Sequence, residues 1–226
     1  MINKHAYVAN DFSDDAIIWK YYPLPAFLAL LEESKLYFTR ADKLTDPNEF
    51  PITEDDARAF RMSMKDYRMS IEQIKARTYL NCWRLSDYES FGMWNAYADA
   101  ATGIAIKTDV KSLFSSVETH NPITAGRIMY IDIEKGMTQK WGKELNINYI
   151  TFAKTKPYEN ESELRLTFET PINDDKPDSI GVPINPQTLI KEIRVGSSSR
   201  SFVPMLIKKI LKRYEITVPV EVSDVR

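Results

Sequence analysis

The chain has 226 residues, 43% apolar and 12% aromatic, which is enough to build one large domain around a hydrophobic core. Its 30 basic and 32 acidic side chains nearly cancel, so no overall electric field draws the protein to nucleic acid or to an anionic membrane. A single cysteine, Cys82, excludes an internal disulfide, and without a signal core or a membrane-length apolar run we expect a cytoplasmic protein that does not contact membranes.

The first third of the chain predicts alternating strands and helices. Residues 17–22 predict a strand, and Pro25 is placed to begin a helix at a position where its missing N–H is harmless. A short strand at 36–39 and a turn at 44–49 follow. Helical spacing at 54–77 predicts one or two helices, which we interpret as an insertion in the domain.

The middle of the chain predicts two further strands around a helix. A strand is expected at 78–83, and Ser86 with Glu89 three residues later fits a capping box that begins a helix ending near Asp99. Strands are then expected at 103–108 and 126–133.

The last third predicts mainly strands. A helix is expected at 141–153 and a basic amphipathic helix at 202–214. Strands are expected at 162–168, 180–184, 192–195 and 216–222. With no internal repeat, the chain predicts one mixed α+β domain over 1–226, with mostly antiparallel central sheets and flanking helices.

The strand that begins at Ser162 carries the strongest candidate site. Alternation predicts Leu164 and Leu166 on one face, and Glu161, Glu163 and Arg165 on the other. A polar strand face of this kind is most often solvated and paired with a neighbouring strand. The alternative is that the two carboxylates, about 7 Å apart along the strand, form the floor of a cleft.

Several kinds of catalytic site are excluded by residue type. The chain holds two histidines and one cysteine, so a Cys/His zinc cage cannot assemble. Neither the glycine-rich dinucleotide fingerprint nor the P-loop pattern is present. Any chemistry must therefore use carboxylates, hydroxyls, cations and aromatic rings.

Several stretches in order resemble a widespread bacterial and phage family known as domain of unknown function 2971. They are LYFTRADKLTDPNEF, NCWRLSDYESFGMWNAYADAATGIAIKTD, GRIMYID, Lys154, YENESELRL and IKEIRVGSS. The most specific pieces are Met93-Trp94-x-x-Tyr97-Ala98 and Glu161-x-Glu163-x-Arg165, and the likeness runs from Trp19 to Gly196. The chain departs from the family pattern at Thr45, Asn48, Trp83-Arg84 and Leu164.

The strand order also resembles that of ADP-ribosyltransferases, which place an essential glutamate on a late strand. This resemblance implies NAD as substrate, Glu163 as the catalytic carboxylate that binds the ribose, and Glu161 as the carboxylate on the acceptor side. Tyr21 or Lys20 would take the first-strand position, where those enzymes hold a histidine or an arginine.

The remaining roles also come from the resemblance. Arg40 or Arg165 would contact phosphate, Trp94 and Tyr97 would stack on the nicotinamide, and Asp46 and Glu49 would shape the cleft mouth. The residue types alone favour plain core packing for Trp94 and Tyr97. The acceptor would be a nucleic acid or a protein, and the family suggests a toxin or phage-defence effector.

Two other classes of function fit the same residues. One is a magnesium-dependent nuclease or phosphotransferase that uses the acidic side chains as oxygen ligands, with Lys154 nearby. The other is a non-catalytic module whose aromatic cleft holds a nucleotide or a protein. A requirement for NAD, for Mg²⁺ or for neither separates the three.

Overall fold

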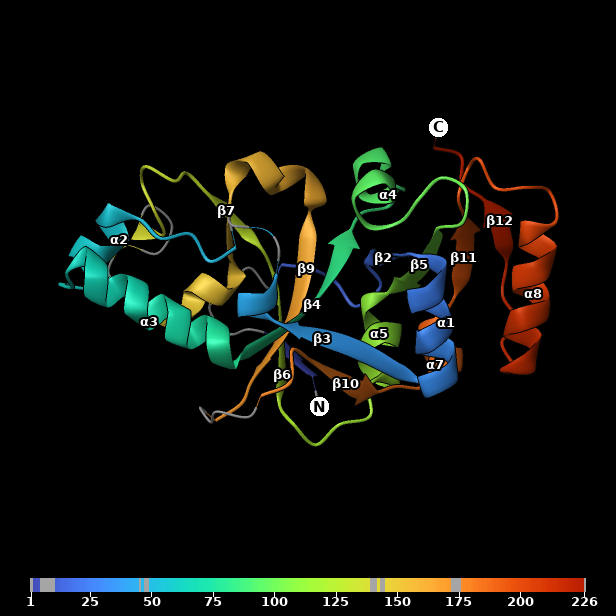
Figure 1. Cartoon of the computed structure of the whole chain (residues 1–226), viewed down its shortest axis with the longest axis horizontal. Helices are drawn as coiled ribbons and strands as arrows, with labels where there is room; N and C mark the ends of the chain where they lie inside the picture. Colours follow the sequence, from blue (N-terminus) through green and yellow to red (C-terminus); the bar gives the residue numbers. More distant parts are fainter. Residues whose placement is uncertain are drawn as a thin grey trace.

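A large, mostly antiparallel sheet with helices packed along it forms the frame of the molecule (Figure 1). The computed structural model describes residues 2–4, 11–44, 46, 49–138, 142, 145–171 and 176–225. This architecture confirms the predicted α+β class. No helix in those ranges is both long and apolar enough to cross a membrane.

The elements follow one another closely along the chain. The strands are β1 (Ile2–Lys4), β2 (Ile17–Tyr22), β3 (Lys35–Arg40), β4 (Thr78–Leu85), β5 (Ile104–Asp109), β6 (Ile123–Arg127), β7 (Met129–Ile131), β8 (Ala153–Thr155), β9 (Glu163–Glu169), β10 (Ser179–Pro183), β11 (Glu192–Val195) and β12 (Val220–Val222). The α-helices are α1 (Leu24–Glu33), α2 (Glu54–Ala59), α3 (Met64–Arg77), α4 (Phe91–Tyr97), α5 (Val110–Ser116), α7 (Pro186–Leu189) and α8 (Val203–Arg213). The 3₁₀ helices among the described residues are η1 (Ala41–Lys43), η3 (Ile147–Phe152) and η4 (Lys156–Glu161).

The sheet forks at the middle of β4. Its strand order is β1-β6-β9-β4-β2-β5-β11-β12, and β3 joins β4 and β10 outside this path. Strand β9 pairs with β4 along Thr78–Arg84, so the other edge of β4 is shared by two strands. There β3 pairs with Tyr79 and Leu80, whereas β2 pairs with Arg84 and Leu85. The ladder is therefore open at residues 81–83.

Side chains replace the missing ladder bonds at the fork. The Asn81 amide donates to the Tyr37 carbonyl at 2.8 Å, and the Trp83 indole donates to the Asn81 side chain at 2.8 Å. The Lys20 ammonium donates to the carbonyl of Cys82 at 2.7 Å. Because buried backbone groups need partners, these bonds let the sheet open while the carbonyls of Tyr37 and Cys82 stay hydrogen-bonded.

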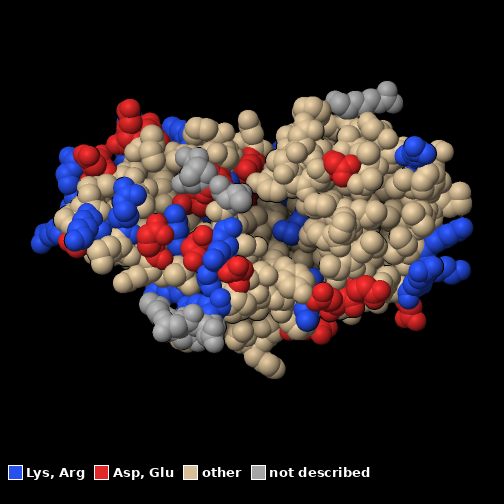
Figure 2. Space-filling model, viewed as in Figure 1, with Lys and Arg blue, Asp and Glu red and all other residues tan. Residues whose placement is uncertain are grey.

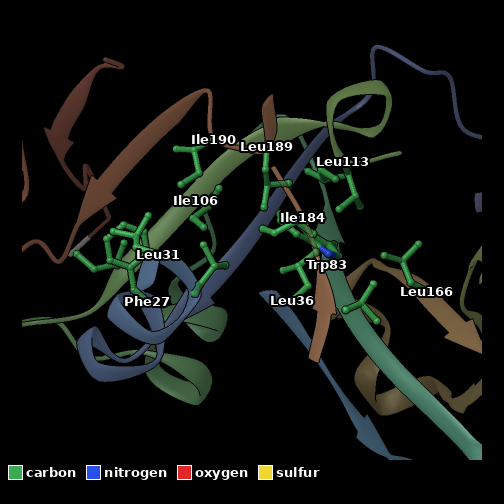
Figure 3. Close-up of a cluster of buried hydrophobic side chains, with 14 of the residues drawn as sticks. Phe27, Leu31, Leu36, Trp83, Ile106, Leu113, Leu166, Ile184, Leu189 and Ile190 are labelled. Carbon is green, nitrogen blue, oxygen red and sulfur yellow. The ribbon is translucent and has the colours of Figure 1, made fainter. Parts of the chain in front are cut away.

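Strand β9 separates two hydrophobic clusters. Leu164 and Leu166 pack into the larger cluster, part of which is shown in Figure 3 with Phe27 and Leu31 of α1. The second cluster contains Phe50, residues of α3 and the η3–β8 segment. The face of β9 that bears Glu163 and Arg165 is turned toward this second cluster, since Arg165 bonds the Thr151 carbonyl there.

The helix predicted from Ser86 begins later. Helix α4 starts at Phe91 and is capped by Ser90, whose side chain accepts from the Met93 N–H. Ser86 instead prolongs the strand pairing, because its N–H donates to the Ile17 carbonyl and its own carbonyl accepts from the Trp19 indole. The capping-box prediction was wrong for this reason.

Other predicted boundaries also shift. The strand expected at 126–133 is two strands, because β6 pairs with β9 and β7 pairs with β8 in a separate small sheet. The helix expected at 141–153 falls partly on 141 and 143–144, which lie outside the described residues, and its described end is the 3₁₀ helix η3. The 54–77 segment is two helices, as one of its alternatives predicted.

A substitution at Gly136 tests how closely this residue packs beside α2. Its φ is +59°, and a Cβ there would lie 2.4 Å from Thr53 Oγ1 and 2.5 Å from Asp56 Oδ2. We expect Gly136→Ala to lower the free energy of unfolding by about 1–3 kcal/mol, measured by urea denaturation. Gly142→Ala is the matched control, because its φ is +49° but nothing lies within 4 Å. Equal losses in both variants would show that the crowding has no effect.

Candidate functional site

A cavity of about 180 Å³ lies beside the fork of the sheet. It is lined by residues of β2, β4, α4, β8, η4, β9 and the 44–49 segment: Trp19, Lys20, Tyr21, Leu44, Asp46, Glu49, Cys82, Trp83, Met93, Tyr97, Lys154, Glu161 and Glu163. Figure 2 shows a hollow near the middle of one face, with basic atoms at its bottom. Seven of the ten residues singled out in the sequence line this cavity.

Lys154 forms ion pairs with three carboxylates at the cavity. Its ammonium lies 2.7 Å from Glu161, 3.0 Å from Asp46 and 3.1 Å from Glu49, and its side chain is 2% exposed. Burial alone would lower the pKa of Lys154, but the charge of Glu49 and the hydrogen bond and charge of Glu161 outweigh it and raise the pKa. The lysine therefore stays charged, and it occupies the place between these carboxylates that Mg²⁺ would need.

Arg165 holds the second part of the charge cluster from behind the cavity wall. Its guanidinium bonds both carboxylate oxygens of Glu163, at 2.6 and 3.0 Å, and reaches Glu49 at 2.8 Å. It also donates to the Thr151 carbonyl at 3.0 Å. Because Arg165 is fully buried and does not line the cavity, the expected contact with a ligand phosphate does not fit its position.

Glu161 and Glu163 do not lie on one strand face, contrary to the alternation in the sequence. Glu161 ends η4, and Ser162 turns the chain with a φ of +46° before β9 begins at Glu163. The turn is fixed by Ser162, whose hydroxyl donates to the Leu85 carbonyl at 2.8 Å. Both carboxylates nevertheless reach the same cavity.

The two glutamates have opposite electrostatic environments. Burial raises the pKa of Glu161 above its usual range, although Lys154 opposes the rise. Burial also pushes the pKa of Glu163 upward, but the charge and hydrogen bonds of Arg165 outweigh it and leave the pKa lowered. Glu163 is thus held ionised while Glu161 takes up a proton more readily, an arrangement that separates the roles of two neighbouring carboxylates.

Lys20 points into the cavity from β2. Its ammonium lies 5.6 Å from the ring centre of Tyr22 and 5.7 Å from that of Trp83, in addition to its bond with the Cys82 carbonyl. Burial lowers the pKa of Lys20, and the nearby Cys82 and Glu163 partly oppose this. Among the described residues, no carboxylate lies within 4.0 Å of the Lys20 ammonium, so an anionic ligand in the cavity would favour its charged form.

Tyr21 supports α4 from beneath. Its hydroxyl accepts the Ser90 N–H at 2.9 Å, and its ring meets Trp94 edge-on with centres 5.3 Å apart. Burial raises the pKa of Tyr21 to about 12. The hydroxyl therefore stays neutral and positions the start of α4, which places Met93 and Tyr97 at the cavity.

The raised pKa of Tyr21 predicts that the folded protein loses stability at alkaline pH. The ordinary pKa of tyrosine is about 10, so between pH 10 and 12 the unfolded chain loses the Tyr21 proton before the folded chain does. The unfolded state then binds fewer protons, and the free energy of unfolding falls as the pH rises. We expect a shallower fall in Tyr21→Phe, measured by urea denaturation at pH 9 and 11; identical slopes would contradict the assignment.

The remaining predicted residues divide between the cavity and other places. Tyr97 is 46% exposed at the cavity edge and donates to Glu161 at 3.1 Å. Trp94 is buried against Tyr21, donates to Glu89 at 2.9 Å and does not line the cavity. Arg40 ends β3 and binds Asp42 and the Lys176 carbonyl, also outside the lining. Neither placement fits the predicted contact with a cofactor.

Some lining residues were not predicted. Trp19, Trp83, Cys82 and Met93 form walls of the cavity. Trp19, Cys82 and Trp83 lie inside predicted strands and Met93 lies inside a family motif, so their place in these stretches was the available signal. Within the described residues, no group of three or more His, Cys, Asp or Glu side chains is arranged to hold a metal ion.

Comparison with known proteins gives one family match and several similar structures. The model of DUF2971, a protein of unknown function, matches residues 93–166, which confirms the resemblance to that family over this stretch. No curated protein matches the chain.

Three of the similar structures are complexes of DarT from Thermus sp. 2.9. The complex with carba-NAD⁺ has a TM-score of 0.41 and 10% identity, with 95% of this chain and 97% of that chain covered. The complex with NAD⁺ has a TM-score of 0.40 and 10% identity, covering 93% and 96%. The complex with ADP-ribosylated ssDNA has a TM-score of 0.40 and 10% identity, covering 95% and 96%. Similarity at this level gives no residue correspondences. The reaction is therefore inferred from the residues that line the cavity.

Proposed function

We propose that the cavity binds NAD and transfers its ADP-ribosyl group to an acceptor. One observation carries the proposal: two glutamates with opposite pKa shifts face a single aromatic-walled cavity, one locked in an ion pair with a buried arginine and one bonded to Lys154 and Tyr97. Such a pair divides charge stabilisation and proton transfer between two carboxylates.

The charge of the cavity suits the nicotinamide end of NAD. Asp46, Glu49, Glu161 and Glu163 bring four carboxylates to it. Asp46 and Glu161 pair with Lys154, Glu163 pairs with Arg165, and Glu49 pairs with both. Carboxylates therefore outnumber these two cations. A flat, positively charged ring fits an acidic cavity with walls of Trp19, Trp83 and Tyr97, because aromatic faces attract cations.

The proposed step breaks one bond and forms another. The bond between the ribose C1′ and the nicotinamide nitrogen breaks, its electron pair leaves with neutral nicotinamide, and positive charge develops on the ribosyl group. Glu163 stabilises that charge and accepts a hydrogen bond from the ribose 2′-OH. The acceptor nucleophile then bonds to C1′, and its proton passes to Glu161.

Lys20 is the group we propose for the pyrophosphate. Of the two lysines that line the cavity, Lys154 is held by three carboxylates, whereas Lys20 bonds a carbonyl. Tyr97 is proposed to stack on the nicotinamide, while Asp46 and Glu49 shape the cavity mouth through Lys154. The acceptor would be a nucleic-acid or protein nucleophile, and a role as a toxin or phage-defence effector remains a prediction to be tested by expression in cells.

The pH dependence of turnover tests the division of roles. Because the pKa of Glu161 is raised and its ionised form must accept a proton, kcat/KM for NAD should fall on the acid side at a pH above the ordinary glutamate range. Glu161→Gln should lower the rate and remove this acid limb, whereas Glu118→Gln, at an exposed site outside the cavity, should keep the wild-type profile. An unchanged acid limb in Glu161→Gln would contradict the proposed role.

Cleavage of nucleic acid that requires Mg²⁺ and no NAD would instead favour the nuclease alternative.

A further inference from the structure

Helix α8 presents a continuous basic face to solvent. Its buried side consists of Ile207 and Leu211, which are 0% and 1% exposed, with partly buried neighbours at 203 and 210. The opposite side bears four exposed cations, Lys208, Lys209, Lys212 and Arg213, which we call the α8 basic face. Successive residues turn by 100° in a helix, so these four occupy one arc of its surface.

The α8 basic face is electrostatically unpaired. Among the described residues, none of its four cations has a carboxylate within 4.0 Å, whereas Lys107, Lys191 and Arg194 in the neighbouring strands and loop all pair with acids. The chain as a whole carries a formal charge of −2, so this concentration of positive charge is local. Figure 2 shows Lys and Arg atoms projecting at the edge that α8 occupies in Figure 1.

An exposed aromatic and aliphatic surface continues the same arc. Phe202 is 54% exposed, Met205 is 58% exposed and Leu206 is 44% exposed at the start of the helix. Arg200 is exposed in the loop just before them. From Phe202 to Lys212 the arc extends about 15 Å along the helix, with one ring and two apolar side chains at one end and cations at the other.

We infer that the α8 basic face, with Phe202, binds single-stranded nucleic acid. Unpaired cations in a row neutralise successive phosphates, and an exposed ring stacks on an unpaired base. The α8 site is separate from the cavity, because α8 packs on β12, and β5 and β11 lie between β12 and the cavity-lining strand β2. Its proposed binding requires neither NAD nor turnover, so it is independent of the proposed transferase activity.

The packing of α8 disfavours a membrane as the partner. A helix that lies in a membrane interface turns an apolar face along its length toward the lipid. In α8 that face is buried in the protein core through Ile207 and Leu211. An acidic protein would satisfy the cations but would not need the ring of Phe202, and it is an outcome that the test distinguishes.

The test is fluorescence anisotropy with a labelled single-stranded oligonucleotide of mixed sequence, without NAD, at 50 and 200 mM salt. The variant Lys208→Glu/Lys209→Glu/Lys212→Glu should bind at least about tenfold more weakly and with a smaller salt dependence. The matched control is Arg61→Glu/Lys65→Glu/Arg68→Glu, which makes the same change of charge at exposed positions around α3. If the α8 basic face is the binding site, the control should bind within about twofold of wild type. Nonspecific attraction to positive charge would instead weaken both variants equally.

Phe202→Ala separates stacking from simple attraction between charges. Loss of one stacked base predicts weakening by about fivefold or more, with the salt dependence unchanged. All these side chains are exposed, and circular dichroism will verify that each variant is folded. The inference is overturned if wild type does not bind the oligonucleotide, if the α8 variant binds as the control does, or if polyaspartate peptide or anionic vesicles bind in an α8-dependent manner while the oligonucleotide does not.

Discussion

Arg165→Met is expected to lower the free energy of unfolding by about 3–5 kcal/mol, the largest effect on stability that the structure predicts. The Arg165 side chain is fully buried and makes the ion pairs that compensate Glu163. Glu49 keeps Lys154 when the arginine is lost, but Glu163 is left as a buried charge without its partner. Urea denaturation at neutral pH measures the difference.

Two further variants test that explanation. Arg127→Met removes an exposed ion pair with Asp11, whose atoms lie 3.1 Å apart, and should change the free energy of unfolding by less than about 1 kcal/mol. Adding Glu163→Gln to Arg165→Met should recover part of the lost stability, because the uncompensated charge is removed. The explanation fails if Arg165→Met and Arg127→Met have the same effect.

Glu163→Gln is expected to reduce nicotinamide release from NAD by about 10²- to 10³-fold, because it removes the charge that stabilises the ribosyl cation. Glutamine keeps the size of the side chain, and Arg165 retains Glu49 and the Thr151 carbonyl as partners. The dissociation constant for NAD should change much less than the rate, since the walls of the cavity are untouched.

The controls for this variant separate chemistry from folding. The melting temperature of Glu163→Gln should be compared with that of wild type, and the rate measured well below both. Glu118→Gln should release nicotinamide at the wild-type rate, because that exposed glutamate lies outside the cavity. Retention of activity within about twofold in Glu163→Gln would remove Glu163 from the mechanism.

The sequence predicted best those features that depend on neighbours along the chain. Alternation and turn residues located β2, β5 and β11 to within a residue or two. Prediction failed where a distant segment decides the structure: Ser86 continues the strand only because Ile17 and Trp19 lie beside it. The fork in β4 has the same origin, since two strands from different parts of the chain share one edge.

In the candidate site, too, local sequence patterns were predictive and contacts between distant segments were not. The Glu-x-Glu motif directed attention to Glu161 and Glu163, and both line the cavity, but the left-handed turn at Ser162 was not foreseen because serine rarely adopts it. Arg40 and Trp94 were chosen by residue type, and type alone does not say whether a side chain faces the cavity. Two of the three carboxylates around Lys154, those of Asp46 and Glu49, come from more than 100 residues earlier in the chain.

The most direct test of the central proposal is chromatographic measurement of nicotinamide when NAD is incubated with the purified wild-type protein, without Mg²⁺, together with oligonucleotide and protein acceptors. The proposed chemistry predicts that nicotinamide accumulates in step with loss of NAD, and that ADP-ribose appears either on an acceptor or free after transfer to water. NAD that remains intact under all these conditions, together with no detectable binding of NAD by calorimetry, would contradict it.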